Sequence, residues 1–89
     1  MAISTHQYTL STTRQALVKG NNYRRSITIL NEDSSINVLL CSNGTDDGMI
    51  ILPLTSITLD PQGSNDPRLP LQFEAASGSP QIRIMEDYI

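Results

Sequence analysis

The 89-residue sequence is poor in the side chains that most catalytic and metal sites require. It contains one cysteine, Cys41, and one histidine, His6. A single cysteine excludes a disulfide within the chain, and one cysteine with one histidine falls short of the four ligands of a structural zinc site. A lone histidine with no carboxylate near it in the sequence does not indicate a Ser-His-Asp or Cys-His arrangement. The sequence therefore predicts neither an enzyme nor a bound cofactor.

Long apolar runs are also missing, and aromatic residues are few. The longest apolar run, Met49–Leu52, is far shorter than the roughly 20 residues that a membrane-spanning helix needs. The first residues, Met1–Tyr8, lack the basic and apolar segments of a secretory signal. We therefore expect no membrane contact and synthesis in the cytoplasm. There is no tryptophan and only one phenylalanine, so the core must be built mainly from aliphatic side chains.

Positive charge is scarce as well. The formal net charge is −3, and the six basic residues are scattered except for the pair Arg24 and Arg25. Nucleic-acid binding depends on clustered basic side chains that neutralise phosphates. The composition therefore argues against nucleic acid as a partner.

Turn-forming segments recur at short intervals along the chain. Each is rich in Gly, Asn, Asp, Pro or Ser, which supply positive φ, a fixed φ or side-chain turn bonds. They are Lys19–Asn22, Asn31–Ser35, Asn43–Gly48, Asp60–Pro67 and Ser77–Pro80.

The runs between these turns alternate apolar and polar residues, which is the period of a half-buried strand. The expected strands are Gln15–Val18, Arg24–Leu30, Ile36–Ser42, Met49–Leu52, Ser56–Leu59, Leu69–Ala75 and Gln81–Glu86. We predict one all-β domain over residues 14–89, a small sandwich or barrel of seven or eight short antiparallel strands. Residues 1–13 form either an N-terminal arm that orders on contact or an edge strand around Gln7–Ser11.

Parity within each run separates inward from outward side chains. The predicted core is Ile27, Ile29, Val38, Leu40, Ile57, Leu59, Leu71, Phe73, Ile82 and Ile84. A second apolar set, Leu39, Leu54, Leu69 and Met85, falls on the other parity or in loops. Single exposed aliphatic residues are ordinary, whereas a contiguous patch of them would mark an interface.

One charged residue stands in the predicted inward row. Arg25 shares the parity of Ile27 and Ile29, and Glu86 shares the parity of Ile82 and Ile84. If the two strands are antiparallel neighbours with Ile27 opposite Ile84, Arg25 faces Glu86. We predict that this ion pair closes one end of the sandwich and that the Asn31 side chain caps the turn at the other end. The alternative is that Arg25 extends to solvent.

The acidic segment 43–48, with Asp60 and Asp66 from another loop, offers oxygen atoms that could bind Ca²⁺. Its spacing does not match an EF-hand, and turn formation alone accounts for every residue in it. We predict no metal site.

Four segments carry a family resemblance: Arg25–Asn31, Gly48–Leu52, Ser56–Leu59 and Gln81–Glu86. With them, the chain from about Arg14 to Glu86 resembles small bacteriophage virion proteins of the capsid decoration (cement) or head-fibre type. It departs at Pro53-Leu54-Thr55, where similar chains often have Pro-Gly. The resemblance implies an all-β sandwich that assembles as a trimer or another symmetric homo-oligomer, and it implies no catalytic residue.

The resemblance implies a structural role in a virion, as a decoration protein that stabilises a capsid through the major capsid protein and its own copies. A head–tail or tail component is an alternative of the same class. A small carbohydrate-binding module is an alternative of another class. That reading predicts that Tyr8, Tyr23 or Tyr88 lines a shallow groove.

Overall fold

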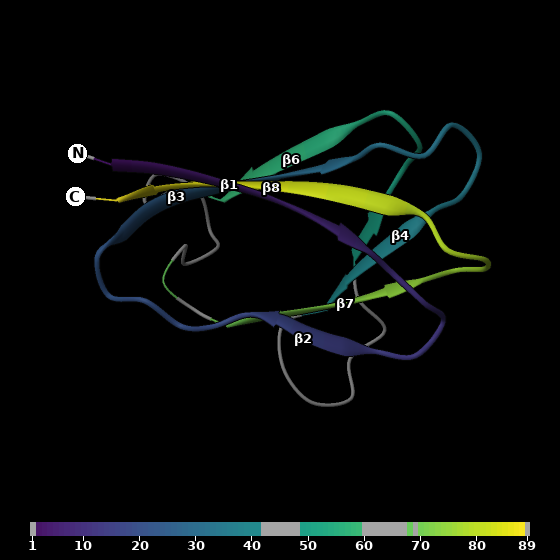
Figure 1. Ribbon diagram of the computed structural model, residues 1–89, viewed down its shortest axis with the longest axis horizontal. Coiled ribbons are helices and arrows are strands. Elements are labelled where there is room, and N and C mark those ends of the chain that lie inside the picture. The colour runs from purple at the N-terminus through teal and green to yellow at the C-terminus, as the bar shows by residue number, and fades with distance from the viewer. Residues whose placement is uncertain (1, 42–48, 60–67, 69, 89) are drawn as a thin grey trace.

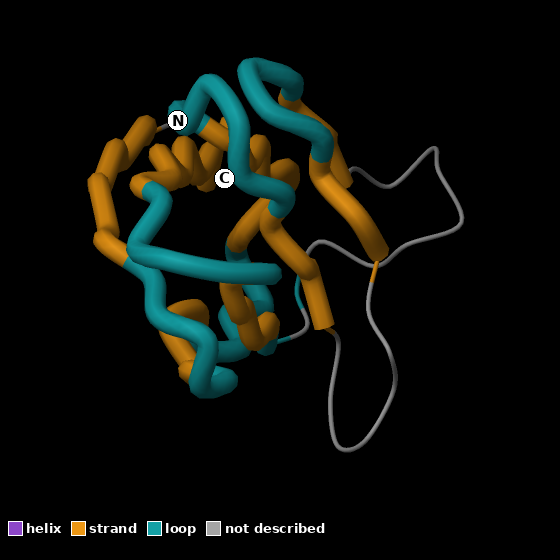
Figure 2. Tube along the Cα trace, turned by 90° about the vertical axis from the view of Figure 1, so that its right-hand side faces the viewer, coloured by secondary structure: helices purple, strands orange, loops and turns teal. Residues whose placement is uncertain are grey.

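The computed structural model describes residues 2–41, 49–59, 68 and 70–88, and these form eight β-strands (Figure 1). The strands are β1 (Ala2–Thr9), β2 (Gln15–Val18), β3 (Arg24–Asn31), β4 (Val38–Cys41), β5 (Met49–Ile51), β6 (Ser56–Leu59), β7 (Leu71–Ala75) and β8 (Gln81–Tyr88). Within these ranges there is no helix, and hence none long and apolar enough to cross a membrane (Figure 2). The predicted all-β class is confirmed.

The strands form two antiparallel four-stranded sheets that pack face to face. The first sheet has the order β1-β8-β3-β6 and the second the order β2-β7-β4-β5. Apart from β4 and β5, consecutive strands lie in different sheets, so the chain crosses repeatedly between the layers. This is the strand order of an eight-stranded jelly roll. The edges of the two sheets are β1 and β6, and β2 and β5.

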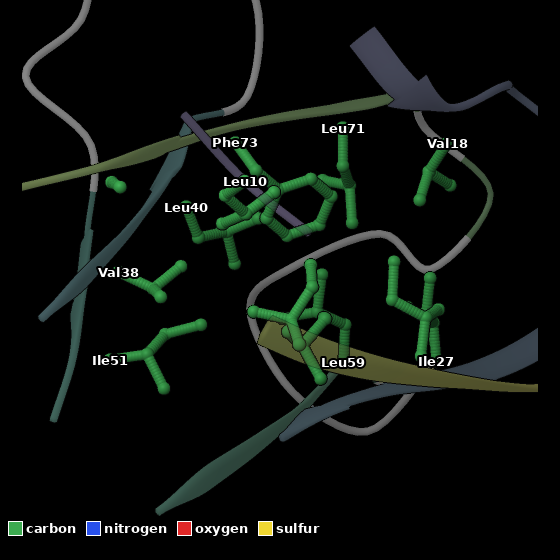
Figure 3. Close-up of a cluster of buried hydrophobic side chains, with 13 residues drawn as sticks. Leu10, Val18, Ile27, Val38, Leu40, Ile51, Leu59, Leu71 and Phe73 are labelled. Atoms are coloured by element: carbon green, nitrogen blue, oxygen red, sulfur yellow. The ribbon is translucent and has the colours of Figure 1, made fainter. Parts of the chain in front are cut away.

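The core lies between the sheets and is aliphatic around Phe73 (Figure 3). In β3, β7 and β8 the buried residues alternate along the strand, as the period-two pattern predicts. Every predicted core residue is buried except Ile57, which is partly buried and packs against the cluster. The core also includes residues outside the predicted set: Leu10, Val18, Cys41, Ile51 and Ala75.

Residues 2–9 form the edge strand β1, which begins before the predicted Gln7–Ser11. All eight residues of β1 pair with β8, from Ala2 opposite Tyr88 to Thr9 opposite Gln81. The chain ends that the structure describes therefore lie side by side at one end of the sandwich (Figure 1). The opposite end holds Asn31, whose register partner in β8 is Ile82.

Candidate functional site

The side chain of Asn31 links three segments at one end of the sandwich. Asn31 is fully buried at the end of β3. Its Nδ2 donates to the backbone oxygens of Ile36, at 2.8 Å, and Ile51, at 3.0 Å. Its Oδ1 accepts a hydrogen bond from the backbone N–H of Asp33, at 3.0 Å. The side chain thus caps the turn after β3, as predicted, and also ties that turn to β5 of the other sheet.

Asp33 holds the next part of the same turn. Its Oδ1 accepts hydrogen bonds from the backbone N–H groups of Ser35, at 2.8 Å, and Ile36, at 2.9 Å. These bonds stabilise the ionised carboxylate, so the pKa of Asp33 lies below its ordinary value of 3.8.

The turn between β5 and β6 is fixed to Asn31 through the backbone. The N–H of Leu54 donates to the oxygen of Asn31, at 3.0 Å, and the N–H of Asn31 donates to the oxygen of Thr55, at 2.9 Å. Within the turn, the N–H of Thr55 donates to the oxygen of Leu52, at 3.2 Å. Pro53 and Leu54 are its central residues, and Leu54 has a φ of 59°. Glycine or asparagine ordinarily occupies such a left-handed position.

Four large apolar side chains are exposed on β5 and this turn. The exposed fractions are 47% for Met49, 56% for Ile50, 57% for Leu52 and 65% for Leu54. We call this set the apolar corner. The stretch 49–59, which contains it, has no Lys, Arg, Asp or Glu. Of the second apolar set, Leu54 is exposed and Met85, on the outer side of the first sheet, is 45% exposed, whereas Leu39 is half-buried and Leu69 lies outside the described residues.

The other end of the sandwich carries a buried ionic cluster. The Arg24 side chain is 1% exposed and its Nη1 lies 2.9 Å from Glu86 Oε2. The same Nη1 donates to the backbone oxygen of Lys19, at 3.0 Å. The Tyr88 hydroxyl donates to Glu86 Oε2, at 2.6 Å, and this bond to a carboxylate raises the pKa of Tyr88 above 10.0. The buried Arg24 guanidinium thus joins β3, β8 and the segment at Lys19 inside the protein.

The predicted pair of Arg25 with Glu86 is wrong. Arg25 Nη2 instead lies 2.9 Å from Asp87 Oδ2, in a pair that is partly exposed. Two features cause the difference. Ile29 rather than Ile27 is opposite Ile84, so the register is shifted by two residues. The pairing with β8 also has a bulge between Arg24 and Ser26, and as a result the Arg24 side chain is buried in the sandwich in place of Arg25. Alternation alone carries no signal for such a bulge.

His6 and Cys41, the two residues with the most reactive side chains, lie apart. His6 is exposed on the edge strand β1, and its Nε2 is 2.8 Å from Ser4 Oγ. Cys41 is buried at the end of β4, with Sγ 4.0 Å from Glu74 Oε1. Among the described residues, no group of three or more His, Cys, Asp or Glu is arranged to hold a metal ion. The segment 43–48, Asp60 and Asp66 lie outside the described residues.

The tyrosines do not share one surface. Tyr8 is opposite Ile82 near the start of β8, whereas Tyr88 ends that strand and is opposite Arg24, next to Tyr23. Six residues of an extended strand separate the two positions by about 20 Å. The described tyrosines therefore do not form a common aromatic platform.

The charged groups of the described strands are confined to the central strands. The edge strands β1, β2, β5 and β6 contain no Lys, Arg, Asp or Glu, whereas β3, β7 and β8 carry the arginines and carboxylates described above.

A scan against protein-family models finds no matching family, and searches of curated proteins and of solved structures find no match.

Proposed function

We propose that the protein is a structural component of a bacteriophage particle, a decoration (cement) protein that binds the major capsid protein and its own copies. The observation that carries this proposal is the distribution of charge and exposed apolar surface. All four edge strands lack charged residues, and the apolar corner is exposed on one of them, β5, and on the turn that follows it.

Uncharged edges are unusual for a protein that works alone. An edge strand presents a row of backbone N–H and C=O groups, and monomeric proteins commonly protect it with lysine, proline or a bulge. The longest edge here, β1, is paired with β8 over eight residues without a register shift and contains none of these protections. The other edges are strands of three or four residues, and β2 has a bulge, so β1 is the edge suited to contacts with neighbouring subunits.

The fold agrees with this role by analogy. Jelly rolls recur in viral capsid proteins and in lectins, and fold by itself does not decide between them. The separation of Tyr8 from Tyr23 and Tyr88 gives no support to a glycan-binding groove. Many weak contacts on a symmetric shell would add up through multivalent attachment, so a small surface on each copy suffices.

The experiment is to ask whether the chain is part of a particle. Phage particles would be purified on a density gradient from lysates of cells that carry the gene and analysed by quantitative mass spectrometry. We expect the chain at a fixed copy number per particle. We also expect it to remain bound in 1 M salt, because uncharged contacts are little affected by ionic screening.

Antibody labelling of the same particles in the electron microscope distinguishes the shell from the tail. Label over the head supports a decoration protein, and label at the tail supports the head–tail or tail alternative. A chain recovered only from the particle-free fraction would overturn the proposal.

A further inference from the structure

The apolar corner is exposed and firmly held. Asn31 anchors it by three hydrogen bonds, from its Nδ2 to the oxygen of Ile51 and from its backbone to Leu54 and Thr55. The side chain that makes the first of these bonds is fully buried. Met49, Ile50, Leu52 and Leu54 are therefore presented by a fixed backbone rather than by a free loop.

Presenting leucine at this position has a cost in stability. A non-glycine residue with a φ near 59° is strained by roughly 1 kcal/mol, and glycine or asparagine would relieve that strain. Leu54 gains little in return from the protein itself, because 65% of it is exposed. A strained, exposed leucine is explained if the apolar side chain makes its contact in an assembly.

The absence of charge suits a contact between identical surfaces. A two-fold interface places a patch against its own copy, so any net charge on the patch would meet a like charge. The protein as a whole has a net charge of −3, whereas the stretch 49–59 has no charged residue. The residues of this stretch therefore bring no like charges of their own together across a two-fold axis.

The size of the corner matches the apolar centre of a small dimer interface. The exposed parts of the four residues, which lie on both faces of the edge strand β5 and on the turn after it, sum to roughly 400 Å², about half of the roughly 800 Å² that each partner buries in a standard interface. The exposed hydroxyl residues Thr55 and Ser56 directly follow Leu54 in the chain, and polar residues bordering an apolar centre are the usual interface pattern.

We infer that the apolar corner binds a second copy of this chain, in a two-fold dimer in which Leu54 and its neighbours pack against the same residues of the other copy. The inference rests on the proposed role in assembly, and it names the surface and the partner. It is tested on the purified protein alone, so a failure here leaves the particle experiment to decide the proposed function independently.

The test is the solution mass of the wild-type protein and of Leu54→Asn, measured by light scattering after size-exclusion chromatography over a dilution series. Asparagine tolerates a positive φ and is polar, so the variant should keep the turn and lose the contact. We expect the wild type to approach twice 9.8 kDa at high concentration. Leu54→Asn should raise the dissociation constant at least tenfold.

The matched control is Met85→Ser, which removes an exposed apolar side chain from the outer side of the first sheet and should leave the dissociation constant unchanged. Urea unfolding at a concentration where all three proteins are monomers should show that Leu54→Asn is at least as stable as the wild type. A second variant, Leu52→Ser, should also weaken the dimer. A monomeric wild type, an unchanged Leu54→Asn dimer, or equal weakening by Met85→Ser would each overturn the inference.

Discussion

At the residue scale, two side chains at the end of β3 organise the turn that supports the apolar corner. Asn31 has a buried amide that bonds to the backbone of the turn after β3 and of β5, and Asp33 accepts hydrogen bonds from the N–H groups of Ser35 and Ile36. A hydrogen bond adds little net stability to a folded protein, whereas a buried polar group that has lost its partner lowers stability substantially. The contribution of Asn31 and Asp33 to stability is therefore best measured by removing their donor or acceptor atoms.

We predict that Asn31→Ala lowers the free energy of unfolding by about 3 kcal/mol, because the oxygens of Ile36 and Ile51 lose their donor. Urea denaturation of the monomer measures this loss. Asn31→Asp should be similarly destabilised at neutral pH, since a carboxylate cannot donate to either oxygen. The exposed Asn22→Ala is the control, and a loss below about 0.5 kcal/mol for Asn31→Ala would contradict the bridging role.

Asp33 gives the protein an acid-sensitive component of stability. Its pKa is lower in the folded protein than its ordinary value of 3.8. The stabilisation is therefore fully present above about pH 4 and is lost as the pH falls through the lower, folded pKa. The melting temperature of the wild type should fall between pH 5 and pH 2.5 by more than that of Asp33→Asn, whose amide oxygen accepts the same bonds at every pH. Parallel pH profiles for the two proteins would refute this assignment.

At the element scale, the pairing of β3 with β8 decides which charges are buried. The bulge between Arg24 and Ser26 sends one arginine into the sandwich and leaves the next at the surface. The same two strands therefore carry two ion pairs of equal length and different burial: Arg24 with Glu86, and Arg25 with Asp87.

Double-mutant cycles should separate these two pairs. Removing one partner of a buried pair leaves an uncompensated charge, so Arg24→Met should destabilise the protein by about 3 kcal/mol and should show strong coupling to Glu86→Gln. The Arg25–Asp87 pair is the internal control, with an expected coupling below about 1 kcal/mol because both side chains are partly exposed. Both energies come from urea denaturation, and equal coupling in the two cycles would contradict the burial argument.

At the scale of the whole molecule, the sequence predicts what depends on local pattern. The all-β class and most of the core follow from alternation, because residues such as Ile27, Ile29 and Phe73 lie in strands whose period is unbroken. Leu10 lies outside the strands, and Val18 and Ile51 lie at strand ends; alternation says little about such positions. The strand order, the β3–β8 register and the bulge at Arg25 depend on contacts between distant segments, which no local pattern encodes.

The apolar corner lies between these two cases. Its residues can be read from the sequence, since Met49–Leu54 is the most apolar stretch and Leu54 follows a proline in a turn. The exposure of these residues cannot be read from the sequence. It depends on the position of β5 at the edge of the second sheet and on the hydrogen bond from Asn31, in the first sheet, to Ile51.

The pairing of Ala2 with Tyr88 makes the response of the molecule to a pulling force depend on direction. A force that separates these two residues acts across the antiparallel β1–β8 ladder and opens its hydrogen bonds one after another, starting at the ends. A force between this end and the turn at Leu54 runs along the strands and loads many hydrogen bonds at once. The protein should therefore unfold readily when Ala2 and Tyr88 are pulled apart, and should resist tension applied along its strands.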